Sequence, residues 1–237
     1  SGLSLSGRLR YDGIGRVVSV ETLSVRAPWG AIGAEGALAL DDARSRIAVR
    51  ARGIDISGLS RALRAPDVVA SRLDGELNAT WPGLDYLAAA VAADVRLTPA
   101  VPPLSDRALP MAGRLSAVAD GGDLQIDVES LRAAGADLSG RITVRDRSTL
   151  EGHLRATVTD IQSAVAIVRP QWQLPASGGL SVVAELAGTV AAPSVKTTFA
   201  APGLTIAGGA SACATGELSY AEGVISIAGL EGALDKA

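Results

Sequence analysis

The sequence predicts an all-β protein, an elongated curved antiparallel sheet of repeated hairpins with short helices between the repeats. Three observations predict this class. Apolar and polar residues alternate with a period of two along most of the chain, turn-forming residues separate the alternating runs, and similar segments recur at an interval of about 105 residues.

The alternating runs predict strands. The clearest cover residues 46–52, 73–80, 124–129 and 150–158, where Val, Ile, Leu, Ala or Gly occupy every second position and mostly charged or polar residues fill the positions between them. Because successive side chains of a strand point to opposite faces, each run has one dry face and one wet face. Tyr11-Asp12-Gly13 and Asp120-Gly121-Gly122 stand between such runs and favour tight hairpin turns.

Two segments interrupt the strand pattern and predict short helices. They cover residues 57–64 and 163–168, and each follows an Asp-Ile pair at 55–56 or 160–161. Asp55 and Asp160, or the serine that comes after each, could serve as the N-cap. The proline-rich stretch 98–104 cannot donate regularly to a sheet, so we expect an edge, a long loop or a crossover there.

The repeat defines the expected domain organisation. Gly7-Arg8-Leu9, Gly113-Arg114-Leu115 and Gly216-Glu217-Leu218 begin equivalent strands. We therefore expect one repeat over 1–112, a second over 113–215 and the start of a third over 216–237, with five or six strands and one short helix in each full repeat.

Composition favours a thin or open structure. Hydrophobic residues make up 48% of the chain but aromatic residues only 3%, so small aliphatic side chains must form the apolar surfaces. The net charge of −3 and the scattered arginines argue against nucleic acid as a partner. No stretch is long and apolar enough for a membrane span and no signal peptide is recognisable, so we expect a fragment whose targeting or anchoring segments lie elsewhere.

The sequence offers no catalytic or metal-binding constellation. His153 falls on the polar phase of its strand and is expected in solvent, while Cys213 is expected as a small buried filler. The pair Asp41-Asp42 suits a hairpin turn, and Trp29, Trp81 and Trp172 suit strand ends. We therefore expect no enzyme, no catalytic residue, no metal and no cofactor.

The chain resembles the TamB and AsmA-like family of bacterial envelope proteins. The resemblance rests on the Gly-Xaa-Leu strand starts, on Ile54-Asp55-Ile56-Ser57-Gly58-Leu59, and on the run from Ala184 to Val195 with its Leu-Ala-Gly-Thr and Ala-Pro phrases. It implies a β-taco groove that conducts phospholipid between the inner and outer membranes and supports outer-membrane biogenesis. It also implies a periplasmic location, an inner-membrane anchor outside this segment, and an outer-membrane β-barrel assembly protein as a partner.

We expect the dry faces of the strands to line this groove and to contact phospholipid acyl chains. The expected lining residues are Leu38, Leu40, Ile47, Val49, Leu73, Leu77, Val95, Leu97, Leu124, Ile126, Val128, Ile142, Val144, Leu150, Leu154, Val158, Leu180, Val182, Leu186, Ile225 and Ile227.

Alternation alone leaves other arrangements open. The same dry faces would also suit an ordinary closed core. A scaffold or adhesin-like solenoid would bind protein instead of lipid, although solenoid coils of about 20–30 residues are much shorter than this repeat. A chaperone-like β groove would accept strands of outer-membrane proteins through a free sheet edge without conducting lipid.

Overall fold

The computed structural model describes residues 2–65, 69–100, 108–168, 171, 174–206 and 209–235. Trp172 and residues 101–104 of the proline-rich stretch lie outside these ranges. The chain divides into two compact units, residues 1–125 and residues 126–237. The unit boundary falls inside strand β8, which covers Asp123–Ala133.

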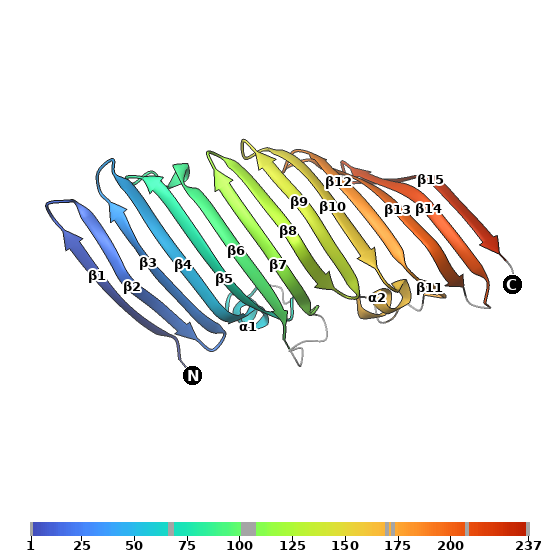
Figure 1. Cartoon of the computed structure of the whole chain (residues 1–237), viewed down its shortest axis with the longest axis horizontal. Coiled ribbons are helices and arrows are strands. Elements are labelled where there is room, and N and C mark those ends of the chain that lie inside the picture. Colours follow the sequence, from blue (N-terminus) through green and yellow to red (C-terminus); the bar gives the residue numbers. More distant parts are fainter. Residues whose placement is uncertain are drawn as a thin grey trace. The chain divides into compact units, whose positions relative to one another are not determined.

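The first unit is an antiparallel meander in which each strand pairs with the next one along the chain (Figure 1). Its elements are β1 (Ser4–Asp12), β2 (Val17–Ala27), β3 (Gly30–Ala39), β4 (Arg44–Asp55), α1 (Ile56–Ala62), β5 (Ser71–Pro82), the 3₁₀ turn η1 (Tyr86–Ala88), β6 (Ala90–Pro99) and β7 (Met111–Asp120).

The second unit continues in the same style after β8. Its further elements are β9 (Ala136–Arg145), β10 (Thr149–Val158), α2 (Ile161–Val168), β11 (Ala176–Gly178), β12 (Leu180–Gly188), β13 (Pro193–Ile206), β14 (Ser211–Ala221) and β15 (Val224–Asp235). The short strand β11 pairs with the end of β13, beside the stretch that pairs with β12. The predicted all-β class, antiparallel hairpins with short helices, is confirmed.

The order of elements repeats along the chain. Four strands, a short α-helix and two further full-length strands run from β1 to β6, and the same order runs from β7 to β13 apart from the extra β11. The three Gly-Xaa-Leu segments lie in β1, β7 and β14, so each one occupies the first strand of its copy. The predicted division at 112 and 215 stays a prediction, because the two compact units follow contact density and not this repeat.

Both predicted helices exist, with shifted limits. α1 begins at Ile56 and ends at Ala62, whereas 57–64 was expected; α2 begins at Ile161, two residues before the expected start. Asp160 caps α2 with its side chain, accepting from the amide of Ser163 at 3.2 Å. Asp55 occupies the N-cap position of α1 but makes no such side-chain bond, and Ser57 instead donates to the carbonyl of Val69.

Buried serines tie strand ends together in the first unit. The Ser45 hydroxyl donates to the Gly83 carbonyl at 2.7 Å and accepts from the Ala39 amide at 2.9 Å. The Ser71 hydroxyl bonds both the amide and the carbonyl of Met111, each at 2.8 Å. Because a buried hydroxyl must find partners, these bonds fix the ends of β3, β5 and β7 relative to their neighbours.

Candidate functional site

The apolar face of the first unit consists of residues aligned across seven strands. Cross-strand register pairs apolar residues with one another from β1 to β7, without a polar residue in the three central rows. These rows are Leu5-Val25-Ile32-Ala51-Gly75-Val95-Leu115, Gly7-Leu23-Ala34-Val49-Leu77-Ala93-Ala117 and Leu9-Val20-Gly36-Ile47-Ala79-Val91-Ala119. Directly opposed residues share a face of a sheet, so the rows form one continuous apolar surface, which we call the apolar face.

No second layer covers this surface in the described part of the chain. A residue in a closed core is almost fully buried, yet Val49, Leu77 and Val95 keep an intermediate exposure. At the β1 edge the same surface is open to solvent, with Leu5 68% and Leu9 67% exposed. The described residues therefore argue against the closed-core alternative for the first unit.

Some positions on this surface are glycines, where no side chain projects from the sheet. A Cβ at Gly36 would lie 2.3 Å from the Arg46 carbonyl oxygen, and one at Gly75 would lie 2.8 Å from that of Asp94. In the second unit the Phe199 ring occupies the space above Gly216, where a Cβ would meet its Cζ at 2.7 Å. The backbone of the adjacent strand thus fills the Cβ space at Gly36 and Gly75, and the Phe199 side chain fills it at Gly216.

The second unit has an equivalent apolar face. Its rows include Leu138-Ala156-Val182-Phe199-Gly216, Gly140-Leu154-Ala184-Thr197-Leu218-Ile227 and Ile142-Gly152-Leu186-Val195-Tyr220-Ile225. Thr197 is the polar member of these three rows. Asp127 in β8 pairs with Arg141 on the opposite face, so alternation places Ile126 and Val128 on the apolar side of their strand.

The structure brings most of the predicted lining residues together within each unit. All of them lie in strands except Leu40, which follows the last residue of β3. Val128 is buried at 8% exposure, whereas Ile225 and Ile227 in β15 are each 66% exposed. The other predicted residues are half-buried on the apolar faces.

Sequence reasoning missed part of these faces. Leu5, Val20, Val25, Leu115 and Phe199 contribute to the rows but were not predicted. The register of β2 shifts between Val20 and Leu23, and this irregularity breaks the period-two pattern there. Leu115 stands between Arg114 and Ser116 in an alternating run, and this signal could have found it.

The opposite face of the first unit is polar and carries exposed ion pairs. Arg50 lies 3.7 Å from Glu35 and 3.2 Å from Glu76, and Arg114 lies 2.7 Å from Asp94. The hydrogen bonds from Arg114 hold the pKa of the Asp94 carboxyl below its usual value. Such exposed pairs contribute little to stability, but they mark this face as the one in contact with water.

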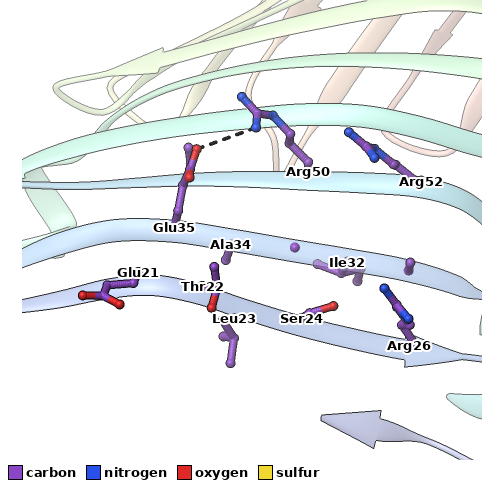
Figure 2. A pocket seen from close by; sticks show the side chains of 13 residues that line it. Glu21, Thr22, Leu23, Ser24, Arg26, Ile32, Ala34, Glu35, Arg50 and Arg52 are labelled. Atoms are coloured by element: carbon purple, nitrogen blue, oxygen red, sulfur yellow. Dashed lines mark ion pairs between the residues drawn. The ribbon is translucent and has the colours of Figure 1, made fainter. Parts of the chain in front are cut away.

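The polar face is hollowed over β2, β3 and β4. A cavity of about 320 Å³ lies there. Figure 2 shows Arg26 and Arg52 towards one end and Glu21 towards the other, with the ion pair of Arg50 and Glu35 between them. An adjoining cavity of about 620 Å³ shares Glu21, Glu35 and Ala48 with the first. Small residues of β3, such as Ala31 and Gly33, form the floor between longer side chains on the flanking strands. These hollows were not predicted, and besides polar side chains their linings include members of the apolar rows such as Leu23, Ile32 and Ile47.

Comparison with protein-family models, with curated proteins and with solved structures finds no match for this chain. Its family and its function are therefore argued from its own residues.

The titratable side chains do not assemble into a reactive site in the described chain. His153 is exposed on the polar face, as predicted, between Glu185 of β12 and Arg141 of β9. Cys213 is exposed in β14, so the prediction of a buried filler was wrong. Its side chain alternates to the polar face of the strand, opposite Ala233. Among the described residues, no group of His, Cys, Asp and Glu has the arrangement of a metal site.

The remaining predictions concern turns, tryptophans and helices. Asp41 accepts from the Ala43 amide at 3.0 Å in the loop between β3 and β4, which confirms the predicted turn. Trp29 and Trp81 are half-buried near strand ends. None of the helices in the described residues has the length and hydropathy required to cross a membrane.

Proposed function

We propose that this chain is a segment of an inner-membrane-anchored envelope protein whose apolar faces carry phospholipid acyl chains across the periplasm. The observation that carries the proposal is the set of uninterrupted apolar rows that lack a covering layer in the described residues. Uncovered apolar surface of this extent in a folded protein calls for an apolar partner.

The dimensions of the first unit suit an acyl chain. Neighbouring strands lie roughly 4.8 Å apart, so a row across seven strands spans about 29 Å. One leaflet of a bilayer holds its acyl chains within about 15 Å, half of the hydrocarbon thickness. Transfer of each methylene from water to such a surface contributes about 0.8 kcal/mol.

The residue types also suit many lipids and not one specific ligand. The rows contain aliphatic side chains and glycine, with no fixed hydrogen-bonding group that would select one lipid head. A head group would stay in water beyond the surface, because it loses its hydration if it is buried without partners. In this proposal the resemblance to TamB and AsmA-like proteins supplies the periplasmic location and the role in outer-membrane biogenesis, with a β-barrel assembly protein as partner.

Mass spectrometry of lipids that co-purify with the folded chain tests the proposal. We expect phospholipids above the background of an unrelated β protein purified in the same way. A photoreactive residue at Leu77 should form lipid adducts, and one at the adjacent Asn78, which lies on the polar face, should not.

Charge substitutions provide a second test. Val49→Glu, Leu77→Glu, Ile126→Glu and Leu154→Glu place carboxylates on the apolar faces and should abolish lipid recovery and transport by the intact protein. Ala48→Glu, Asn78→Glu and Thr157→Glu are the matched controls, since these positions face the polar side. Transport that survives the first set, or a folded chain without lipid above background, would instead favour the scaffold or chaperone alternative.

A further inference from the structure

The outer edge of β1 has no partner strand in the described chain. β1 pairs with β2 along Ser4 to Asp12 and with no other described strand. It contains no proline, and its apolar side chains Leu5, Leu9 and Tyr11 are 62–68% exposed. Natural proteins usually protect an edge of this kind, because its free backbone groups pair readily with another strand.

The internal repeat shows what covers the equivalent edges. Gly113-Arg114-Leu115 in β7 and Gly216-Glu217-Leu218 in β14 are equivalent to Gly7-Arg8-Leu9 in β1. β6 covers the edge of β7, and β13 covers the edge of β14. The two pairings have the same register, since each places a large apolar residue opposite the glycine: Leu97 opposite Gly113 and Phe199 opposite Gly216.

Each covering strand carries a charged residue that is opposite in sign to the middle residue of the Gly-Xaa-Leu motif beside it. Arg114 pairs with Asp94 at 2.7 Å, and Glu217 pairs with Lys196 at 3.3 Å. Asp94 lies opposite Ser116 and Lys196 lies opposite Ser219, so both partners occupy the same diagonal position. Where the motif has Arg, the covering strand has Asp, and where the motif has Glu, the covering strand has Lys. Register and charge are therefore matched in the same way at both covered edges.

We propose that the β1 edge docks an antiparallel β-strand that has an acidic residue three positions before a large apolar residue. In the register of the repeat, the apolar residue lies opposite Gly7 and the acidic residue opposite Arg10, diagonal to Arg8. The incoming strand hydrogen-bonds through its backbone, while the acid and the apolar side chain select its register. β6 has this pattern in Asp94 and Leu97, whereas β13 has Lys196 in place of the acid.

Peptide binding to the whole chain tests the proposal. The probe is a fluorescent peptide with the β6 sequence, residues 90–99, and its matched control carries Lys at the position of Asp94. We expect fluorescence anisotropy to show tighter binding of the acidic peptide. An exposed ion pair of this kind changes the affinity by about 1.4- to 5-fold. Lys in place of Asp also introduces repulsion, which increases the ratio of the two peptide affinities further.

A variant of the chain reverses the expected preference. Arg8→Glu combined with Arg10→Ser converts the β1 motif to the Gly-Glu-Leu-Ser of β14, which Lys196 of β13 faces. This variant should bind the lysine peptide more tightly than the acidic one. Both substitutions lie on exposed positions, and circular dichroism checks that the sheet remains folded.

The register is tested by crosslinking. A photoreactive residue in place of Thr98 in the peptide should attach to Ser6 and its immediate neighbours, because Leu97 then lies opposite Gly7. Binding of neither peptide, equal binding of both to the native chain and to the variant, or crosslinks to another strand would each overturn the proposal. Lipid binding by the apolar face is not required for any of these outcomes.

Discussion

At the scale of single residues, glycines determine how closely the strands approach. Gly36 lies in β3 directly opposite Ile47 of β4, within an otherwise aliphatic row. Any side chain there would point at the backbone of the neighbouring strand, since the space for a Cβ is already taken by the Arg46 carbonyl. Glycine is therefore required at Gly36 by packing.

Gly36→Ala should destabilise the protein. A Cβ at 2.3 Å from the Arg46 oxygen forces the backbone of β3 or β4 to shift, and such overpacking costs about 1–3 kcal/mol. Urea unfolding measures this loss as a lower midpoint at unchanged slope. Gly203→Ala is the control, because a Cβ at Gly203 has no atom within 4 Å, and its unfolding free energy should stay the same or rise. A stable Gly36→Ala protein would show that the strands are less closely spaced than described.

At the scale of elements, Asp160 links the start of α2 to β11. Its carboxylate accepts from the Ser163 hydroxyl at 2.6 Å, from the Gly178 amide at 3.0 Å and from the Gln162 amide at 3.3 Å. These bonds lower the pKa of Asp160 from 3.8 to about 2. The bond from the Ser163 hydroxyl has the largest effect, and the bond from the Gly178 amide comes next. α1 lacks an equivalent, because Asp55 makes no side-chain cap bond.

Acid should therefore loosen the start of α2. The folded state has the lower pKa, so ionised Asp160 stabilises it fully above about pH 3.8, and this contribution is lost as the pH falls through about 2. NMR titration should show the amide shifts of Gln162, Ser163 and Gly178 moving together with a midpoint near 2. In Asp160→Asn the shared transition should disappear. A midpoint close to 3.8 in the native protein would contradict these hydrogen bonds.

At the scale of the whole molecule, stability comes from sheet pairing and local packing more than from a central core. The buried hydrophobic residues among those described are mostly alanines, such as Ala39, Ala70 and Ala79, with Ile54 as the largest side chain below 4% exposure. The long aliphatic side chains of the rows remain half-exposed. Their partial exposure leaves surface free for a partner at a low cost in folding stability.

Truncation of a row residue should therefore cost little. We expect Leu77→Ala to lower the unfolding free energy by about 1 kcal/mol, because its side chain is only partly removed from water. Ile54→Ala, at a residue 3% exposed, should cost about 2–5 kcal/mol. Both are in the first unit, so chemical denaturation compares them in one transition. Equal losses would mean that another layer covers Leu77 in solution.

The strands and helices were largely predictable from the sequence, because period-two alternation and the Asp-Ile pairs are local signals. Prediction failed where a local signal was ambiguous. Cys213 stands between two alanines in an alternating run, and only the pairing of β14 with β13 and β15 shows that its side chain belongs to the polar face. The hollow beside Arg26 and Arg52 also depends on three strands at once.

The sequence by itself determined the all-β class, the repeat and the division of each strand into a dry and a wet side, since these follow from the geometry of an extended chain. The tertiary structure alone decided the cross-strand register and, among the described residues, the lack of a layer over the apolar rows and of a partner strand at the outer edge of β1. The physical reason is that alternation records which side of a strand avoids water. It does not record which strands lie beside it, or whether a second layer lies above it.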